Sequence, residues 1–279
     1  MSQNKNRSKL SERESLEKKR AFLVKIVGEA GVLLKDYFTS RNFSVKSKKG
    51  VEIITEADDE VDKKLREQIK AVYADSEFLT EETAPNDFRG YEKKRNLFII
   101  DPIDGTTNFS RGRQNFSISI ALVDEGVTQV AVIGVPMIGK IYEADRINEH
   151  ALVNGNSIEV SDTSDLSRAT FACDWPYDLN KKMQMVEILK RLTEKGNVRS
   201  IISGGSAAAD LAALAEGQSD IYVIPTLKPW DVAAASLLIE KAGGKVTRLD
   251  GKQWDIFQAG DGILVSNGCL HNELVWLFE

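Results

Sequence analysis

A short apolar run at residues 97–100, Leu-Phe-Ile-Ile, limits the possible fold of this 279-residue chain more than any other feature. Such a continuous run is typical of a strand buried on both faces, because a half-exposed strand alternates apolar and polar residues. Two acidic residues, Asp101 and Asp104, follow it at once. The run therefore predicts a sheet covered on both sides, with carboxylates at the end of one strand.

The first half of the chain combines helices with a run of strands. Residues 11–14, Ser-Glu-Arg-Glu, form a capping-box pattern that predicts the start of a long helix, ending before Thr39. A second helix is expected to open near Thr55, with a buried stripe of Val61, Leu65, Ile69 and Val72. Strands are predicted at 77–79, 97–100, 117–123, 127–135 and 140–144, and the alternation of Ser and Ile indicates that 117–123 is half-buried.

The second half alternates helices and strands. Helices are predicted at 182–192, 206–215 and 231–242, with a short one at the C-terminus, and strands at 198–202, 221–224 and 262–266. Asp250-Gly251 reads as a hairpin turn. The sequence thus predicts an α/β protein with an α+β N-terminal half and an α/β C-terminal half. We expect a charged extension at 1–18, an N-terminal half at 19–160 and a C-terminal half at 161–279.

Composition and charge exclude several classes of protein. The net charge of −5 makes the chain a poor candidate for a nucleic-acid-binding protein, which usually has a basic balance. No stretch approaches the roughly 20 apolar residues of a membrane span, and residues 1–20 lack the apolar core of a secretory signal. Cys173 and Cys269 have neither a metal-ligand spacing nor a disulfide pattern. These features predict a cytoplasmic protein.

Residues 101–108, Asp-Pro-Ile-Asp-Gly-Thr-Thr-Asn, carry the strongest chemical signal. Asp101 is expected at the carboxyl end of the buried strand, where α/β proteins bind ligands, and Asp104 returns a second carboxylate to the same place. Gly105 allows a close approach of its backbone to a ligand, and a helix starting there would offer free N–H groups to an anion. A turn-rich loop is the alternative, but two carboxylates delivered to one point repel each other without a cation. The pattern therefore favours Mg²⁺ beside a phosphate.

Three other acidic segments follow the same logic, although each is ordinary alone. Glu81 and Glu82 follow a short strand, as a solvated acidic pair also would. Asp231 and Asp58 each lie where an acidic residue suits the first turn of a helix.

Together these segments resemble the inositol monophosphatase family. The resemblance rests on Glu81-Glu82, on residues 101–109 and on Trp230-Asp231-Val-Ala-Ala, in matching order and spacing, and it spans about residues 20 to 275. Residues 55–58 (Thr-Glu-Ala-Asp) and 205–208 (Gly-Ser-Ala-Ala) are similar to flanking motifs of the family. The resemblance implies a layered α/β/α/β/α fold, a Li⁺-sensitive Mg²⁺-dependent phosphatase and a homodimer.

The resemblance also assigns roles to single residues. One metal would be held by Glu81, Asp101 and the backbone carbonyl of Ile103, a second by Asp101, Asp104 and Asp231, and a third, weaker one by Glu81 and water. The N–H groups of Gly105 and Thr106 would hold the phosphate, and Thr106 backed by Asp58 would help to deprotonate the attacking water. The residues implied to face the leaving alcohol are Asp104, Gly205, Ser206, Ala207 and Asp231.

The chain departs from the inositol-selective members of this family at two places. Those members carry a Glu seven positions before the Trp-Asp aspartate, where this chain has Ile224. The stretch after the main motif brings Arg111 and Arg113, which would suit a second phosphate or else be solvated loop residues. We therefore expect broad selectivity for polyol or sugar phosphates, with fructose 1,6-bisphosphate close behind and histidinol phosphate or a nucleotide 3′-phosphate less favoured. A non-enzymatic alternative is a partner in a transcription-associated complex, as some bacterial members are.

Overall fold

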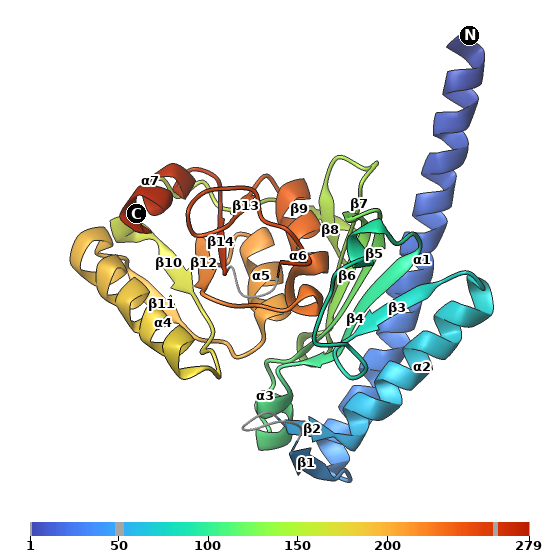
Figure 1. Ribbon diagram of the computed structural model, residues 1–279, viewed down its shortest axis with the longest axis horizontal. Coiled ribbons are helices and arrows are strands. Elements are labelled where there is room, and N and C mark those ends of the chain that lie inside the picture. The colour runs from blue at the N-terminus through green and yellow to red at the C-terminus, as the bar shows by residue number, and fades with distance from the viewer. Residues whose placement is uncertain (1, 48–52, 259–261, 279) are drawn as a thin grey trace.

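The computed structural model describes residues 2–47, 53–258 and 262–278, with side chains described from Arg13 onward. Its described part forms five stacked layers, alternately helical and β (Figure 1). The five-layer α/β/α/β/α arrangement expected from the sequence is confirmed.

A seven-stranded sheet forms the second layer and runs in the order β3-β4-β5-β6-β7-β8-β9. Only β3 and β4 are parallel, and the other neighbours are antiparallel. Its strands are β3 Glu77–Thr80, β4 Leu97–Asp104, β5 Ser117–Asp124, β6 Val127–Val135, β7 Lys140–Asp145, β8 Ala151–Val153 and β9 Asn156–Ile158.

A five-stranded sheet forms the fourth layer in the order β11-β10-β12-β14-β13. β10 pairs in parallel with β11 and β12, whereas β14 is antiparallel to β12 and β13. The strands are β10 Thr170–Ala172, β11 Ser200–Ile202, β12 Ile221–Ile224, β13 Lys245–Thr247 and β14 Ile263–Ser266. A separate antiparallel pair, β1 Val45–Ser47 and β2 Ile53–Thr55, lies near the start of the chain.

Helices form the remaining three layers. They are α1 Ser2–Ser40, α2 Glu56–Val72, α3 Thr106–Arg111, α4 Leu179–Arg191, α5 Ala207–Ala215, α6 Pro229–Lys241 and α7 His271–Phe278. Short 3₁₀ turns occur at Tyr91–Lys93, Pro136–Ile138 and Leu166–Arg168, and a π turn at Leu192–Gly196 extends α4.

Three apolar cores bind these layers together. α1 and α2 pack on one face of the seven-stranded sheet through residues such as Leu23, Leu65 and Ile100. α5 and α6 lie between the two sheets and contact both. α4 and α7 cover the outer face of the five-stranded sheet. The buried strand expected at 97–100 is β4, which lies next to the edge strand β3 and has α2 on one face and α6 on the other.

Four sequence expectations about these elements are wrong. The first helix begins at Ser2 rather than at the capping box of residues 11–14, because the segment contains no Gly or Pro to interrupt it and consists largely of good helix formers. Val72 is exposed rather than part of the buried stripe, since α2 ends there. β5 is buried on both faces rather than one, because its small Ser residues let α6 pack closely. A turn is present at Asp250-Gly251, closed by a hydrogen bond from the N–H of Gly251 to the carbonyl of Arg248 at 3.0 Å, but it is not a hairpin between paired strands, because β14 begins only at Ile263.

Candidate active site

A β-bulge in β4 places the first two carboxylates on the same face of the sheet. Asp101 lies opposite Ser119 of β5 and Asp104 lies opposite Ser117, so three steps along β4 match two steps along β5. In a regular strand residues i and i+3 face opposite sides, and the extra residue cancels that difference. Pro102 lies in the bulge, where its lack of an N–H group costs no ladder hydrogen bond. Asp101 was expected at the strand end, but β4 continues through Asp104.

The third carboxylate comes from the start of α6. Pro229 and Trp230 open the helix, and the side chain of Asp231 accepts a hydrogen bond from the backbone N–H of Lys228 at 2.8 Å. The hydroxyl of Ser119 donates to the carbonyl oxygen of Trp230 at 3.1 Å, which ties α6 to β5 beside Asp101. The helix thus holds Asp231 over the bulge of β4.

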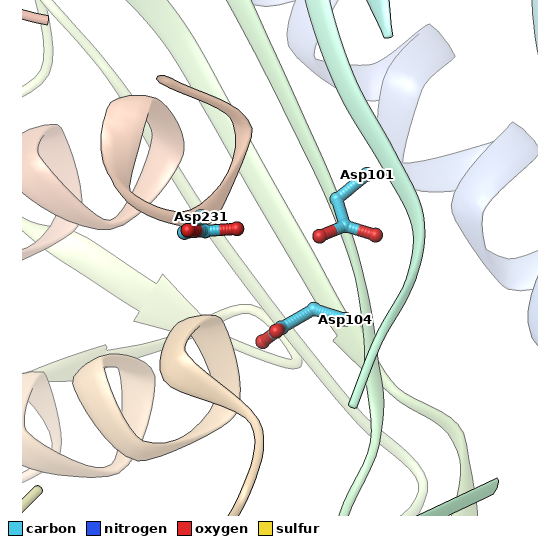
Figure 2. Close-up of side chains that lie close together, drawn as sticks. All are labelled: Asp101, Asp104 and Asp231. Carbon is cyan, nitrogen blue, oxygen red and sulfur yellow. The ribbon is translucent and has the colours of Figure 1, made fainter. Parts of the chain in front are cut away.

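Asp101, Asp104 and Asp231 converge, with one carboxylate oxygen from each lying within 4.8 Å of the others. Figure 2 shows the three side chains turned toward one another from β4 and α6. Burial raises the pKa of Asp101 well above its usual value, and the charges of Glu81 and Asp104 raise it further. Burial followed by the charge of Asp104 raises the pKa of Asp231 in the same way. Such mutual repulsion makes this group of carboxylates a favourable place for a cation.

Asp104 is the most firmly held member of the cluster. One of its carboxylate oxygens, Oδ2, accepts hydrogen bonds from the Ser206 hydroxyl at 2.6 Å and from the backbone N–H of Ala208 at 2.7 Å. Burial raises the pKa of Asp104 to about 7, although the bond from Ser206 lowers it in part. The other oxygen, Oδ1, makes none of these bonds, so Asp104 can bind a ligand without giving up its anchors.

Glu81 and Ile103 lie next to the three aspartates. The backbone N–H of Glu81 donates to the carbonyl of Ile100 at 3.1 Å, so the end of β3 is fixed beside Asp101. The charge of Glu81 raises the pKa of Asp101 and of Asp58, which places its carboxylate near both. Ile103 lies in the bulge, and its carbonyl oxygen accepts a hydrogen bond from the Thr106 hydroxyl at 3.0 Å.

Asp58 and Thr106 are in contact, as the family resemblance implies. The hydroxyl of Thr106 lies 3.1 Å from Oδ1 of Asp58, while Oδ2 of Asp58 accepts from the backbone N–H of Thr55 at 2.8 Å. Burial raises the pKa of Asp58 to about 6, against the lowering effect of its bonds from Thr55. A carboxylate with such a pKa can accept a proton near neutral pH.

Two glycine turns meet beside the cluster. Gly105 has a φ of +94° and precedes α3, so the helix start expected at this position is confirmed. A Cβ atom at Gly105 would lie 2.9 Å from the carbonyl oxygen of Gly205, which has a φ of +81°. The backbones of the two turns therefore approach as closely as glycine alone allows. Ser206 and Ala207 follow directly, at the start of α5.

The positions that depart from the inositol-selective pattern are Ile224, Arg111 and Arg113. Ile224 is buried in β12. Arg111 and Arg113 are both exposed, and Arg113 lines a cleft of about 370 Å³ together with Asn115, Gly204 and Asp210. Within the described part of the chain, neither arginine side chain forms an ion pair.

Two acidic residues near the cluster were not singled out from the sequence. Asp174 and Asp210 are bound to the backbone N–H groups of Gly205 and Gly204, at 2.8 Å and 3.1 Å. Burial raises the pKa of both, that of Asp210 to about 7. Each had a sequence signal: Asp174 follows the apolar residues of β10, and Asp210 is the lone charge in the alanine-rich α5.

Buried, converging carboxylates beside a tight glycine turn define a class of hydrolase that acts on phosphate with the help of divalent metal. The model of the inositol monophosphatase family matches residues 15–278, and the chain belongs to that family. It is a phosphoric monoester hydrolase by this membership, and the family implies use of a divalent metal.

Individual relatives agree with the family assignment. A Thermotoga maritima protein named fructose-1,6-bisphosphatase/inositol-1-monophosphatase is 32% identical over 255 residues, or 91% of this chain and 93% of its own. The Nus factor SuhB of Salmonella typhimurium is 32% identical over 231 residues, covering 82% and 84% of the two chains. The solved structure of a Thermotoga maritima IMPase superposes with a TM-score of 0.82 at 30% identity, covering 94% of this chain and 96% of the other.

In the residues that the structure describes, no helix combines the length and apolar character needed to cross a bilayer.

Proposed function

We propose that this protein is a Mg²⁺-dependent phosphatase that hydrolyses phosphate monoesters of small polyols or sugars, with broad selectivity for the alcohol. The observation that carries the proposal is the convergence of Asp101, Asp104 and Asp231 within 4.8 Å. No ion pair in the described part of the chain involves these three carboxylates, so no side-chain cation neutralises them.

The donor set fits Mg²⁺. Hard carboxylate oxygens are the ligands that this ion prefers, and it usually keeps several waters. We assign one ion to Glu81, Asp101 and the carbonyl of Ile103, and a second to Asp101, Asp104 and Asp231. A third ion would rest on Glu81 and water. When bound, Mg²⁺ would neutralise phosphate oxygens, lower the pKa of water and stabilise the leaving alkoxide.

The chain's own groups would orient the substrate and move a proton. The backbone N–H groups of Gly105 and Thr106, at the open end of α3, would bind the phosphate. The hydroxyl of Thr106 lies within hydrogen-bond distance of Asp58, so a proton from the attacking water would pass through this hydroxyl toward the Asp58 carboxylate. Asp104, Gly205, Ser206, Ala207 and Asp231 would face the leaving alcohol.

Ile224 is the reason to expect broad selectivity. Rejection of the wrong alcohol is strong where a site hydrogen-bonds a substrate hydroxyl, whereas an apolar wall discriminates by only about 1–3 kcal/mol. A buried Ile cannot accept the hydrogen bond that a Glu at this position would accept. The alcohols accepted should therefore be several of similar size.

A second candidate substrate is fructose 1,6-bisphosphate. Arg113 lines the cleft behind Gly204 and has no acidic partner among the described residues, so it is available for a second phosphate. The name of the Thermotoga maritima relative, which includes this activity, supports the same choice. The Salmonella typhimurium relative named as a Nus factor supports the non-enzymatic alternative of a transcription-associated complex.

We also infer a cytoplasmic homodimer. Trp175, Tyr177 and Leu179 follow β10 and are more than half exposed, and Ile201 and Ile202 of the neighbouring edge strand β11 are also exposed. A second copy would cover this apolar surface. Light scattering after gel filtration should give twice the monomer mass, and a Leu179→Glu variant should shift toward the monomer.

The central experiment is a phosphatase assay on chelator-stripped protein, with and without Mg²⁺. We expect activity to be lost on stripping and restored by Mg²⁺, with inhibition by Li⁺ at roughly tens of millimolar through competition for the more weakly held site. The substrates are inositol 1-phosphate, glycerol 2-phosphate, fructose 1,6-bisphosphate and phosphoadenosine phosphate. Full activity without metal would contradict the metal assignment, and a preference for inositol 1-phosphate above about 10³-fold would contradict broad selectivity.

A further inference from the structure

The turn at Gly204 and Gly205 is held by side chains from three different parts of the chain. The carbonyl of Gly204 accepts from the Asn108 side chain at 2.8 Å, and its N–H donates to Asp210 at 3.1 Å. The N–H of Gly205 donates to Oδ1 of Asp174 at 2.8 Å. Asp174 alone among these contacts holds Gly205 itself, the residue whose backbone meets Gly105.

Asp174 is in turn fixed by a rigid partner. Its second oxygen, Oδ2, accepts a hydrogen bond from the hydroxyl of Tyr222 at 2.8 Å. Tyr222 is fully buried in β12, where it is among the largest enclosed side chains of the protein. Because the Tyr222 hydroxyl and the Gly205 N–H both donate to this carboxylate, Asp174 connects strand β12 of the five-stranded sheet to the backbone of the glycine turn.

The glycine turn is in contact with both parts of the proposed chemistry. The carbonyl of Gly205 abuts the phosphate turn at Gly105, and the next residue, Ser206, donates to Asp104 at 2.6 Å. A shift of Gly205 would therefore change the gap between the phosphate turn and the surface that faces the alcohol. Misplacement by about 1 Å in such a site lowers rates by about 10²-fold.

We propose that Asp174 is a positioning residue for the leaving group: by joining Tyr222 to the N–H of Gly205, it sets the place of the turn against which the alcohol rests. The inference depends on the proposed phosphatase function, because only a leaving alcohol gives the turn a role in the reaction. Asp174 itself touches neither substrate nor metal in this scheme.

Leaving groups of different chemistry test the role. Inositol 1-phosphate releases an alcohol that needs to be positioned, whereas p-nitrophenyl phosphate releases a phenolate that departs with little assistance. Asp174→Ala removes both hydrogen bonds, and we expect kcat/KM for inositol 1-phosphate to fall about 10- to 100-fold, mainly through kcat, with less than about a threefold loss for p-nitrophenyl phosphate. Asp174→Asn can still accept from Gly205 and donate to the Tyr222 oxygen, so we expect it to remain within about threefold on both substrates.

Two further variants control for folding. Asp178→Asn changes a nearby exposed acidic residue that caps α4, where Asn caps equally well, and should leave both activities unchanged. Tyr222→Phe keeps the ring and breaks only the anchor of Asp174, so it should reduce activity in the same direction by a smaller factor. If Asp174→Ala does not fold, Tyr222→Phe can be used to test the proposal in its place.

Amide exchange of Gly205, followed by NMR, provides a readout that does not need activity. We expect the Gly205 N–H to exchange at least about tenfold faster in Asp174→Ala than in the wild type, and not in Asp178→Asn. An equal loss on both substrates, or unchanged exchange at Gly205, would overturn the proposal. A wild-type protein that hydrolyses none of the phosphates would reject the phosphatase function and with it the leaving-group role, while Gly205 exchange would still decide whether Asp174 holds the turn.

Discussion

Replacing Asp104 by Asn is expected to stabilise the metal-free protein while weakening its response to Mg²⁺, because only the second of the proposed ions uses this carboxylate. The amide fits the site, because its oxygen can take the place of Oδ2, which accepts from Ser206 and from the N–H of Ala208. Its NH₂ group then occupies the position of Oδ1. The substitution therefore removes a negative charge from the cluster and keeps the bonds that hold residue 104.

The size of the effect follows from the pKa of Asp104, which burial raises from 3.8 to about 7. An acid with a raised pKa in the folded state destabilises the fold increasingly as the pH rises from 3.8 to about 7, and by a constant amount above that. At about 1.4 kcal/mol per pKa unit, the full penalty at pH 7.5 is about 4 kcal/mol. The remaining carboxylates still repel each other, so we expect Asn to recover on the order of 2 kcal/mol, or roughly 5 °C in Tm.

Thermal unfolding in chelator and in Mg²⁺, at pH 7.5 and pH 5, measures this prediction. The gain of the variant in chelator should shrink at pH 5, where the folded wild type has already taken up the proton. Mg²⁺ should raise the Tm of the wild type and of an Asp178→Asn control by more than that of the variant, which keeps only the ion assigned to Glu81, Asp101 and Ile103. The kcat of the variant should fall by at least about 10²-fold. A variant that is less stable than the wild type in chelator and still responds fully to Mg²⁺ would refute the reasoning.

Three further substitutions test other parts of the molecule. Ile224→Glu should raise the kcat/KM ratio of inositol 1-phosphate to glycerol 2-phosphate, and an unmoved ratio in a folded variant would mean that selectivity is set elsewhere. Arg113→Ala should lower kcat/KM for fructose 1,6-bisphosphate about tenfold, because a charge-assisted hydrogen bond is lost, and should leave kcat/KM for glycerol 2-phosphate unchanged. Arg111 lies outside the cleft, so Arg111→Ala should have a smaller effect. Equal losses on both substrates would argue against a role of Arg113 in binding a second phosphate. Burial lowers the pKa of His271 to about 4, so stability should fall as the pH drops from about 6.5 to 4, by up to about 3 kcal/mol. Urea titrations should show that this contribution disappears in His271→Gln but persists in a His150→Gln control, and an identical pH dependence in both variants would contradict the assignment.

The parts of the site that the sequence predicts are those marked by local signals. Asp101 and Asp104 follow an apolar run, and Asp231 lies at the start of a helix, so simple rules for strand ends and helix starts identify them as candidate site residues. The contact between Asp58 and Thr106 followed only from the family resemblance, because the two residues are 48 positions apart.

The parts that escaped prediction depend on contacts between residues far apart in the sequence. No local pattern tells that Asp174 will meet Gly205, 31 residues away, or that Tyr222 will hold its other oxygen. The alternation in β5 suggested one solvent-facing side, but Ser119 instead contacts the start of α6. Small polar residues have the same appearance in a sequence whether they face water or a closely packed helix.

The bulge in β4 makes part of the proposed coordination independent of side-chain identity. Asp101 and Asp104 are three residues apart and would face opposite sides of a regular strand, so aligning them is the first effect of the bulge. What it also adds is main chain outside the ladder: the N–H of Ile103 donates to Asp101 at 3.1 Å, and its carbonyl is left for Thr106 and the proposed ion. Residue 103 should therefore tolerate other apolar residues, since every amino acid brings the same carbonyl. Deleting Pro102 would leave both acids on one face of a regular strand but return the carbonyl of Ile103 to the ladder, so chain length rather than chemical identity would be the property under selection at this point.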